Sequence, residues 1–376
     1  MFDTTLILLG AGSSSRFKLP VKKQWLYSGD VPLWLQVADN FKTLDIFEQI
    51  IIVSSKSDIE FMQNFTTDYR FIVGGDTRQA SLSNALAFVD SSYVMVSDIA
   101  RCCIPKDMIL RLLDAKEDAS CIVPTLKATD TLYMNDMPID RESIKVIQTP
   151  QLSVTSLLKK ALESDEVFTD DSSAIASLGE KIKFVDGDTK AHKLTTIEDL
   201  SKLDCIKAPK DINLVGFGID THPFEDNKDM YLCGVKIDSD FGFKAHSDGD
   251  VAIHALIDAL LGACGMGDIG ELYPDDDNSY AGIDSKILLR DSVAKIRAFG
   301  FDIINIDMTI VAQTPRLKEY KPLMRDTISK ILDIKPQFVN IKATTSEKLG
   351  FIGRKEGVTV HAVANVKYFN HKEIAQ

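Results

Sequence analysis

The chain has 376 residues, of which 45% are hydrophobic and 26% are charged, and its formal net charge is −12. This length exceeds one ordinary hydrophobic core, so we expect two globular domains. The negative charge argues against broad binding to nucleic acid or to anionic membranes. It still permits a small anionic substrate, because basic clusters and bound metals can reverse the field inside a pocket.

Two further features bear on where the protein works. The N-terminal apolar run lacks the basic start and the cleavage site of a signal peptide, and no stretch approaches transmembrane length. The six cysteines form no CxxC pair. We therefore expect a cytoplasmic protein whose cysteines are reduced and serve packing.

Apolar runs alternate with amphipathic segments through the first half of the chain. The runs are Thr5–Leu9, Gln49–Val53, Tyr69–Val73, Tyr93–Val96 and Ala119–Val123. Buried strands that alternate with helices predict the α/β class, with an open, mostly parallel sheet that binds ligands at the carboxyl ends of its strands.

Polar loops follow several of these runs. The glycine and serine loop Gly10–Arg16 exposes backbone amides that can hold phosphates, although many tight strand-to-helix turns look the same. A second polar loop spans Gly74–Ser81. Asp98 ends another strand and suits a Mg²⁺ ligand. The alternative for Asp98, a helix N-cap for a segment near Pro105, is disfavoured by the residues between them.

Eight segments of this half, in order, are similar to one family. They are GAGSSSRF, KKQ, GGDTRQAS, SDIAR, ATDT, DRESIKVIQTPQ, FTDDSSA and KLTTIEDL. Over residues 3–204 the chain resembles the 2-C-methyl-D-erythritol 4-phosphate cytidylyltransferases. The resemblance implies a Rossmann-like nucleotidyltransferase domain that transfers CMP from CTP to methylerythritol phosphate, releases pyrophosphate and uses Mg²⁺ or Mn²⁺. The family usually has proline directly before the KQ pair, where this chain has Val21-Lys22, and Ser13–Ser15 replace a segment with glycine and a second basic residue.

The same resemblance implies roles for individual residues. The catalytic cations would be Arg16, Lys23, Arg141 and Lys193, and Asp98 would hold magnesium. The substrate-binding residues would be Gly12, Gly75, Arg78, Ser81, Arg101, Thr131, Thr149 and Thr169. Arg101 resembles a residue that reaches the substrate of a partner subunit.

A short linker, Cys205–Asp211, separates the two halves, and we expect domains at 1–208 and 209–376. The second half opens with a strand at Asn213–Ile219, followed by Asp220 and His222. A helix from Asp250 to about Gly262, capped by Ser247, would place Asp250, His254 and Asp258 on one face. Its other face would pack through an apolar stripe of Val251, Ala255, Leu256, Ala259 and Leu260.

Zinc binds histidine nitrogen and carboxylate oxygen, and a catalytic site leaves one position for substrate. Asp220, His222 and His254 meet that need. The alternatives are a turn histidine before Pro223 and an ordinary core histidine in the helix.

The rest of the second half alternates between helices and strands. The expected elements are a helix at Ser285–Phe299, a strand at Asp302–Val311, a helix at Leu323–Leu332 and strands at Phe338–Ala343 and Gly357–Tyr368. This order fits an α+β domain. The turn Thr344–Glu347 suits phosphate oxygens, with Glu347 near a second cation, although a capped helix start would look similar.

The segments GFGIDTHPF, AHSDGDVAIHALIDALLGACGMGDIGELYPDDD, AQTPR, KATTSEKLGFIGR and EGV resemble the 2-C-methyl-D-erythritol 2,4-cyclodiphosphate synthases over residues 212–370. The resemblance implies zinc on Asp220, His222 and His254, a second divalent cation (Mg²⁺ or Mn²⁺) at Glu347, and His246 and Thr345 as catalytic residues. The substrate-binding residues would be Ser247, Asp268, Ile269, Gly270, Tyr273, Asp275, Asp277, Ala312, Pro315, Arg316, Thr344, Ser346, Glu347, Phe351 and Arg354.

Together the resemblances imply a bifunctional enzyme of non-mevalonate isoprenoid biosynthesis. Its small-molecule partners would be CTP, methylerythritol phosphate and the 2-phosphate of diphosphocytidyl-methylerythritol, which the second domain cyclises with release of CMP. No nucleic acid or membrane partner is expected. Family dimers for the first domain and trimers for the second imply a homo-oligomer, a hexamer or larger. The alternatives are a sugar-nucleotide pyrophosphorylase fused to an unrelated metal-binding domain, and a metal-binding scaffold with relic sites.

Overall fold

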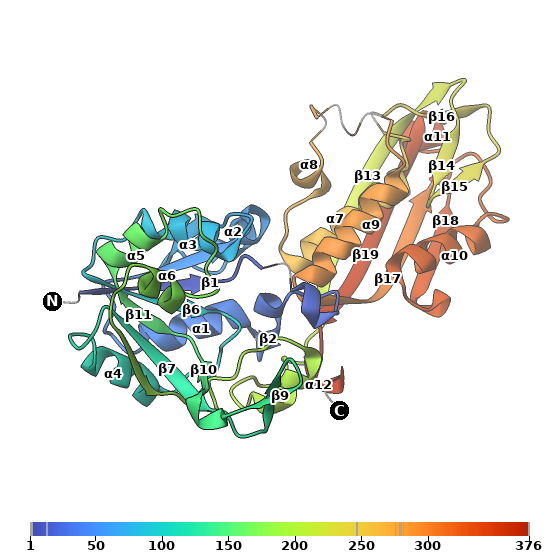
Figure 1. The fold of residues 1–376 in the computed structure, drawn as a ribbon. Coiled ribbons are helices and arrows are strands. Elements are labelled where there is room, and N and C mark those ends of the chain that lie inside the picture. Colours follow the sequence, from blue (N-terminus) through green and yellow to red (C-terminus); the bar gives the residue numbers. More distant parts are fainter. Residues whose placement is uncertain are drawn as a thin grey trace. The chain divides into compact units, whose positions relative to one another are not determined.

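The structure is a computed structural model that describes residues 3–12, 14–245, 247–274, 276–277, 280 and 282–374. The chain forms two compact units (Figure 1). The first comprises residues 1–209 together with 370–376, and the second comprises residues 210–369. The chain therefore crosses between the units twice. The sequence interpretation gave residues 209–376 to the second domain, whereas the structure places the segment from Asn370 onward in the first unit.

An eight-stranded sheet forms the centre of the first unit, in the order β10-β7-β11-β6-β1-β4-β5 with β12 paired to β7. Its strands are β1 (Thr4–Leu9), β4 (Gln49–Ser54), β5 (Arg70–Val73), β6 (Tyr93–Asp98), β7 (Cys121–Lys127), β10 (Lys145–Ile147), β11 (Gln151–Val154) and β12 (Ile182–Asp186). The pairings of β1 with β4 and β6, of β4 with β5 and of β7 with β12 are parallel. The predicted α/β class is confirmed, and the strands absent from the prediction are the short β10, β11 and β12.

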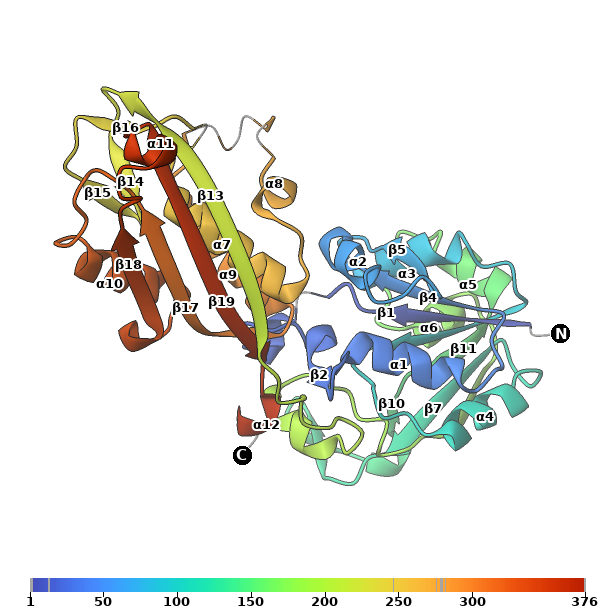
Figure 2. The ribbon, with the colours of Figure 1, turned by 180° about the vertical axis from the view of Figure 1, so that it is seen from behind.

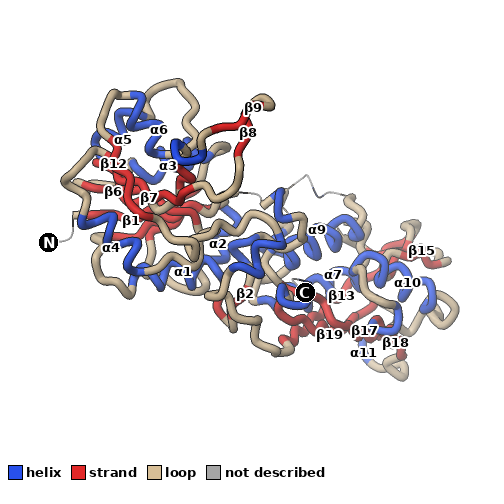
Figure 3. Tube along the Cα trace, turned by 60° about the horizontal axis from the view of Figure 1, so that its bottom comes forward, coloured by secondary structure: helices blue, strands red, loops and turns tan. Residues whose placement is uncertain are grey.

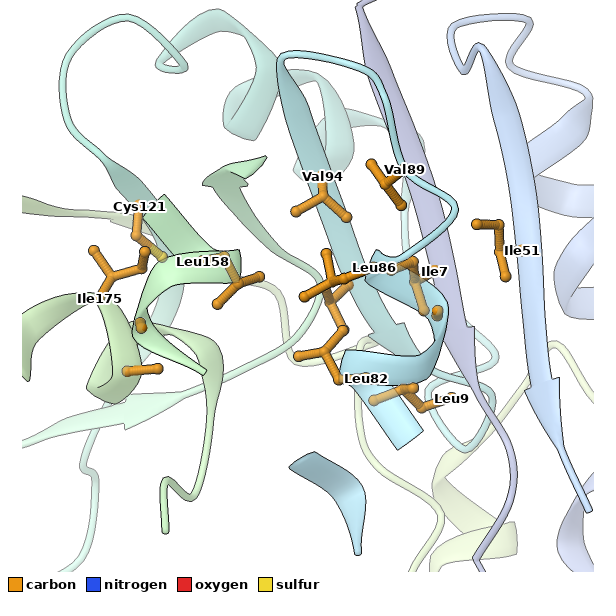
Figure 4. Packing of buried hydrophobic residues seen from close by; sticks show 14 of the residues in the cluster. Ile7, Leu9, Ile51, Leu82, Leu86, Val89, Val94, Cys121, Leu158 and Ile175 are labelled. Carbon is orange, nitrogen blue, oxygen red and sulfur yellow. The ribbon is translucent and has the colours of Figure 1, made fainter. Parts of the chain in front are cut away.

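Helices cover both faces of this sheet. They are α1 (Leu33–Lys42), α2 (Lys56–Met62), α3 (Arg78–Leu86), α4 (Lys106–Asp114), α5 (Thr155–Ala161) and α6 (Asp171–Ser177). Alternate residues of β1 and β6, such as Ile7 and Val94, meet Leu82 of α3 and Leu158 of α5 in one buried core (Figure 4). α1 and α4 lie on the opposite side (Figure 1). Burial on both faces explains why the central strands are continuous apolar runs.

Short elements complete the first unit. They are the 3-10 turns η1 (Ser15–Phe17), η2 (Lys23–Trp25), η3 (Arg141–Ser143) and η4 (Ile197–Lys202), the hairpins β2–β3 (Tyr27–Ser28, Val31–Pro32) and β8–β9 (Leu132–Met134, Met137–Ile139), and the helix α12 (His371–Ile374). The β8–β9 hairpin projects from the body of the unit (Figure 3). α12 packs against η4, and its His371 is fully buried.

The second unit has a five-stranded sheet in the order β16-β13-β19-β17-β18. Its strands are β13 (Leu214–Asp226), β16 (Phe241–Phe243), β17 (Phe301–Val311), β18 (Val339–Thr344) and β19 (Gly357–Tyr368), and β14 (Met230–Leu232) pairs with β15 (Val235–Ile237). The helical elements are α7 (Val251–Cys264), α8 (Ile269–Leu272), α9 (Ser285–Ala298), α10 (Lys321–Leu332), η6 (Pro336–Phe338) and α11 (Gly350–Gly353). The predicted α+β alternation is therefore observed.

Helix α7 lies very close to β13 because that strand has glycine at the contact. A Cβ atom on Gly218 would lie 2.0 Å from the carbonyl oxygen of Ala255, and one on Gly216 would lie 1.9 Å from that of Ala259. The predicted apolar stripe of α7 is fully buried.

The start of α7 differs from the prediction. Asp250 is the N-cap: its carboxylate accepts hydrogen bonds from the backbone N–H groups of Ile253 (3.1 Å), Cys233 (2.9 Å) and Gly234 (2.5 Å). Ser247 does not cap the helix, and its hydroxyl contacts His254 instead.

The two faces of the second sheet differ. α7 and α9 lie on one face (Figure 1), and Figure 2 shows the opposite face. There β13 exposes Val215, Phe217 and Ile219, which are 63%, 60% and 51% accessible to solvent. Three large apolar side chains in alternate positions of one strand form an apolar surface, which we call the β13 stripe.

Two further observations concern helices and cysteines. Within the part of the chain that the structure describes, no helix has the length and apolarity needed to cross a membrane.

Cys103 and Cys205 form a disulfide, whereas the other four cysteines are free and buried. The prediction of six reduced cysteines is therefore wrong for Cys103 and Cys205, because residues distant in sequence meet beside the sheet.

Candidate active sites

A cavity of about 640 Å³ opens at the carboxyl ends of β1 and β6. It is lined by eight residues that the sequence assigned to nucleotide, metal or phosphate: Gly12, Arg16, Lys23, Gly75, Arg78, Ser81, Asp98 and Lys193. Leu9 and Asp98 pair in register at the ends of the two strands, so the loops that follow them face the same space. The sequence thus located the residues of this cavity from their positions after strands.

Asp98 is held between positive charges at the floor of the cavity. Its Oδ2 accepts a hydrogen bond from Nζ of Lys193 at 2.9 Å and from Oγ1 of Thr149 at 3.2 Å. Burial raises the pKa of Asp98, but Lys193, Arg78 and Arg101 outweigh this and leave the pKa below its ordinary value. A carboxylate kept ionised at a strand end is suited to a divalent cation.

Lys23 brings a second ammonium group to the same cavity. Its Nζ donates to the carbonyl oxygen of Leu194 at 3.1 Å, and its backbone N–H donates to Oγ of Ser14 at 3.2 Å. Burial lowers the pKa of Lys23, and the charges of Lys193 and Arg16 lower it further. Mutual repulsion of these cations makes the cavity receptive to a polyanion.

The loop before α3 is shaped by its own side chains. Ser81 donates to the carbonyl oxygen of Gly75 at 3.2 Å and accepts from the N–H of Gly75 at 3.1 Å. Thr77 caps the helix by accepting from the N–H of Ala80. Arg78 then begins α3 with its guanidinium on the cavity wall.

A second cavity of about 420 Å³ adjoins the first. It shares Arg78, Asp98 and Lys193 with the first cavity and adds the predicted residues Arg101, Thr149 and Thr169. Nη1 of Arg101 donates to the carbonyl oxygen of Ala191 at 2.6 Å. The shared residues place cationic groups at the junction, where two phosphorylated ligands could meet.

Two predicted residues of this half do not line either cavity. Arg141 begins η3, and its Nη1 donates to the backbone carbonyl of Thr129 at 3.0 Å. Thr131 precedes the β8–β9 hairpin and is exposed. Both lie on the projecting arm of the unit.

Sequence reasoning missed two carboxylates that bond the side chains in and next to these cavities. Asp171 bonds Arg78, and Asp58 bonds both Lys22 (2.6 Å) and Gln24 (3.0 Å). The Lys22–Asp58 pair shows how the chain accommodates lysine where the family usually has proline. The FTDDSSA segment contained a signal for Asp171, whereas nothing in the sequence around Asp58 indicated its role.

In the second unit, one carboxylate and two imidazoles converge. Asp220 Oδ2 lies 3.0 Å from Nε2 of His222 and 3.3 Å from Nδ1 of His254. One ligand atom from each residue falls within 4.8 Å of the others. Asp220 and His222 alternate on β13 and so point to the same face, and α7 brings His254 to them.

The surroundings orient these imidazoles. Nδ1 of His222 lies 3.0 Å from the carbonyl oxygen of Gly249, which fixes Nε2 toward Asp220. Nε2 of His254 contacts the hydroxyls of Ser247 (3.2 Å) and Ser285 (3.0 Å). Histidine metal ligands are commonly oriented by such partners on the other ring nitrogen. The donor set and its supports therefore fit a zinc ion.

Asp220 and His222 shift each other's pKa values toward the charged forms. Burial raises the pKa of Asp220, but hydrogen bonds from His222 and His254 outweigh it and hold the pKa well below its usual value. Burial lowers the pKa of His222, and Asp220 outweighs this, so the pKa is raised.

The cluster opens into a cavity of about 390 Å³. Predicted residues on its wall are Asp220, His222, Ser247, His254, Ile269, Gly270, Tyr273 and Asp277. Asp268 caps α8 beside it by accepting from the N–H of Glu271 at 2.9 Å. The Tyr273 hydroxyl instead points into the core, within hydrogen-bond distance of the carbonyl oxygen of Leu288 (3.0 Å) and the carboxylate of Asp291 (2.9 Å).

Asp258 and Tyr280 also line this cavity without having been assigned to substrate. Asp258 accepts a hydrogen bond from the N–H of Ile269 at 2.9 Å, so it fixes the start of α8. Helix spacing had placed Asp258 beside His254 as a supporting group. Tyr280 carried no sequence signal.

The remaining predicted residues form a separate group that does not line this cavity. They are Ala312, Pro315, Arg316, Thr344, Thr345, Ser346, Glu347, Phe351 and Arg354. They end or follow β17 and β18, or belong to α11 and its end. The N–H of Ala312 donates to the carbonyl oxygen of Thr344 at 2.9 Å. Thr345 donates to Glu347 at 2.7 Å. His246 and Asp275 lie outside the described residues.

Comparison with known proteins agrees with both halves of this geometry. A family model described as 2-C-methyl-D-erythritol 4-phosphate cytidylyltransferase matches residues 4–207, and a model described as the YgbB family matches residues 214–367. The second match shows that the C-terminal half belongs to a defined family, so it is not an unrelated metal-binding domain joined to a nucleotidyltransferase.

Curated relatives and one solved structure extend over nearly the whole chain. The bifunctional enzyme IspD/IspF of Sulfurovum sp. strain NBC37-1 is 65% identical over 373 residues, which cover 99% of this chain and 100% of the relative. That of Sulfurimonas denitrificans is 56% identical, covering 98% and 96%. The structure of the bifunctional IspDF from Campylobacter jejuni is similar with a TM-score of 0.92 and 49% identity, covering 98% of this chain and 100% of that one. The chain therefore belongs to the bifunctional IspD/IspF enzymes of isoprenoid biosynthesis, which carry a cytidylyltransferase and a cyclodiphosphate synthase on one polypeptide.

Proposed function

We propose that the two adjoining cavities of the first unit bind CTP and methylerythritol phosphate side by side. The observation that carries this proposal is that Arg16, Lys23, Lys193 and Asp98 all line the same cavity. Phosphoryl transfer depends on positioning and charge neutralisation more than on a covalent nucleophile. An oxygen of the methylerythritol phosphate attacks the α-phosphorus of CTP, and pyrophosphate leaves.

Each residue of the two cavities has a role that follows from its position. Arg16 and Lys23 neutralise the triphosphate, while Gly75, Arg78 and Ser81 surround the cytidine. Lys193 and Arg78, which line both cavities, lie where the transferred group passes between ligands. The space beside the backbone of Gly12 is open, since no atom lies within 4 Å of a Cβ built there, and the phosphates can approach the backbone at that point.

Thr149 and Thr169 in the second cavity bind the methylerythritol phosphate. Asp98 would hold a magnesium ion, and that ion would supply charge neutralisation for the pyrophosphate.

The test of this assignment is pyrophosphate release from CTP compared with UTP, GTP and ATP. CTP with methylerythritol phosphate is expected to be the active pair. Lys193→Ala should abolish that activity, and the matched control Lys190→Ala, at an exposed lysine nearby, should retain it. Equal loss in both variants would contradict the role given to Lys193.

We further propose that Asp220, His222 and His254 hold zinc in the second unit. Bound zinc supplies Lewis-acid charge neutralisation at a phosphate of the substrate. Ser247, Asp268, Ile269 and Gly270 orient that substrate, and Tyr273 and Asp277 receive its erythritol part. The 2-phosphate is already ionised, so its attack on the cytidine-side phosphate needs no base, and CMP leaves.

The residues of the separate group complete this site from another copy of the chain. Ala312, Pro315 and Arg316 would hold cytosine, and Glu347 a second divalent cation, Mg²⁺ or Mn²⁺. Thr344, Ser346, Phe351 and Arg354 would complete the site. Thr345 would stabilise the transition state, the role that the resemblance also gives to His246. The supporting observation is that the two groups of predicted residues occupy different places on one chain.

A homo-oligomer follows from two surfaces. The β13 stripe leaves one sheet face of the second unit apolar, and the β8–β9 hairpin exposes Tyr133, Met134 and Met137. Thr131 and Arg141, which do not line the cavities of their own chain, would serve the first site of a neighbouring copy. Trimeric contacts through the second unit and dimeric contacts through the first require a hexamer or larger assembly. A monomeric mass in sedimentation at micromolar protein would contradict this assembly.

We also propose a cytoplasmic location.

The two reactions are not consecutive, because the second substrate carries a 2-phosphate that the first product lacks. A separate phosphorylation must come between them, so product cannot pass directly from the first site to the second.

A further inference from the structure

Three cysteine sulfurs gather beside the cavities of the first unit, and the two reactions use none of them. Cys103 and Cys205 are joined by a disulfide across a sequence separation of 102, with their Cα atoms 5.5 Å apart. Sγ of Cys102 lies 3.9 Å from that of Cys103. Cys103 and Cys205 are half-buried, whereas Cys102 is buried.

The disulfide fastens two segments that both contribute to the first site. One segment, 98–103, begins at Asp98 and contains Arg101. The other, 191–205, contains Lys193, whose Nζ donates to Asp98 at 2.9 Å. The two segments are therefore joined at two places: by the disulfide between Cys103 and Cys205, and by the hydrogen bond between Lys193 and Asp98 in the cavity.

Noncovalent contacts already align these segments. The N–H of Leu194 donates to the carbonyl oxygen of Ala100 at 2.8 Å, and Arg101 donates to the carbonyl oxygen of Ala191 at 2.6 Å. Each of these bonds can break when the segments move. The disulfide is the covalent member of the set, so it limits how far the two segments can separate.

Asp199 makes the 191–205 segment stiff enough to transmit this constraint. Its carboxylate accepts from the N–H groups of Thr195 and Thr196, both at 2.9 Å, and lies 2.6 Å from Nε2 of His192. These bonds tie the start of η4 to the residue next to Lys193. A displacement at Cys205 is thereby passed toward the ammonium group in the cavity.

We propose that Cys103 and Cys205 form a reversible dithiol–disulfide couple, a covalent modification site whose oxidation state sets the activity of the cytidylyltransferase site. The proposal rests on the function proposed above for that site. On oxidation the two thiols lose two protons and two electrons and one S–S bond forms. A low-molecular-weight disulfide accepts the electrons, its own S–S bond breaks, and two small thiols are released.

Cys102 does not compete for this couple. It lies within reach of Cys103, but burial raises the pKa of its thiol to about 12, so it stays protonated and is a poor nucleophile. One pairing is therefore favoured. Disulfides of reducing compartments are usually transient and regulatory, which agrees with a reversible bond in a cytoplasmic enzyme.

Reduction is expected to loosen the alignment of Lys193 with Asp98. A displacement of about 1 Å can cost up to about 100-fold in rate, so we expect about a tenfold fall in kcat/KM for pyrophosphate release. The change should appear mainly in kcat, because Lys193 lies where the transferred group passes between the two ligands. CMP release by the second unit provides an internal control in the same molecules, and its rate should stay the same.

The experiment uses the full chain equilibrated with dithiothreitol or with oxidised glutathione. Alkylation followed by mass spectrometry reports the state of Cys103 and Cys205, and both activities are measured on each sample. Cys103→Ser and Cys205→Ser should each lose the response to oxidation. Cys121→Ala removes a buried thiol outside the pair and should retain the response.

Three outcomes would overturn the inference. The first is equal pyrophosphate release in fully oxidised and fully reduced protein. The second is a metal ion bound by the reduced protein and lost in Cys205→Ser, which would assign the sulfurs to a metal site. The third is the absence of pyrophosphate release in both states, which would overturn the proposed function of the first site as well.

Discussion

Arg78 donates a hydrogen bond from Nη1 to Oδ1 of Asp171 at 2.9 Å, and the Asp171 side chain is fully buried. Arg78 lines both cavities of the first unit, so Asp171 fixes the direction in which this guanidinium enters the site. Burial raises the pKa of Asp171, and the charge of Arg78 opposes that rise.

Asp171→Ala should therefore destabilise the first unit. Removing Asp171 deletes a charged hydrogen bond from a buried position, while Arg78 stays partly exposed, so we expect a loss of about 1–3 kcal/mol of unfolding free energy. Urea denaturation measures this loss, and KM for CTP should rise in the folded fraction. Asp165→Ala changes an exposed carboxylate and should stay within about 0.5 kcal/mol of wild type. Similar losses in both variants would contradict the role of the Arg78–Asp171 pair.

The close contact of α7 with β13 gives a matched pair of glycine substitutions. Gly218→Ala would place a methyl group 2.0 Å from the carbonyl oxygen of Ala255, so the helix must move away. We expect a loss of about 1–3 kcal/mol in unfolding free energy and a lower zinc content. Gly262→Ala, inside α7 with nothing within 4 Å, should raise stability by about 0.5–1 kcal/mol. A Gly218→Ala protein as stable as wild type would show that the helix does not depend on this contact.

His254→Ala tests the independence of the two sites. It removes one of the three residues proposed to hold zinc, so metal analysis should show loss of zinc, and CMP release should fall by at least about 100-fold. Pyrophosphate release from CTP should be nearly unchanged. Equal loss of both activities in a folded variant would argue against independent sites.

His371 predicts a pH dependence in the first unit. Burial lowers its pKa from the ordinary 6.5 to about 4. A lowered pKa means that the unfolded chain binds the proton more readily, so the stabilisation is complete above pH 6.5 and is lost as pH falls toward 4. The shift corresponds to about 3 kcal/mol at most.

His371→Phe should remove this component. Unfolding of both proteins is measured by urea at several pH values, and the stability difference between them should change between pH 6.5 and pH 4. His361→Phe, at a half-buried histidine of β19, provides the comparison. A constant difference for His371→Phe over that range would contradict the prediction.

The β13 stripe predicts the assembly state. Phe217→Asp places a charge in an apolar surface that would be desolvated in a trimer, and sedimentation should show a smaller species. CMP release should fall with assembly, because the site would lose the residues supplied by another copy. Leu323→Asp changes another exposed apolar residue, on α10, and should leave the mass unchanged. An unchanged mass for Phe217→Asp would exclude this surface.

Much of both sites could be predicted because short-range geometry determines it. Asp220 and His222 alternate on one strand, and Asp98 ends another, so strand periodicity alone orients them. The position of His254 was also predictable, since helix spacing separates its face from the packed stripe. These are the positions where local pattern and tertiary structure agree.

The rest depends on contacts between residues far apart in sequence. β11 is a four-residue antiparallel strand, Gln151–Val154, whose polar residues carry no strand signal of their own. The Cys103–Cys205 bond and the burial of His371 likewise depend on packing between distant segments. The Ser247 cap was wrong for a local reason: Asp250 binds three backbone amides, and Ser247 meets an imidazole instead.

The double crossing between units has a consequence for how the molecule is made. Leu214 pairs with Val366, so the two ends of the second unit lie side by side, and the chain returns from there to supply α12 to the first unit. A ribosome must therefore synthesise the entire second unit before it releases His371. The unit whose translation begins first is completed last, and until then its nascent form lacks the helix that packs on η4.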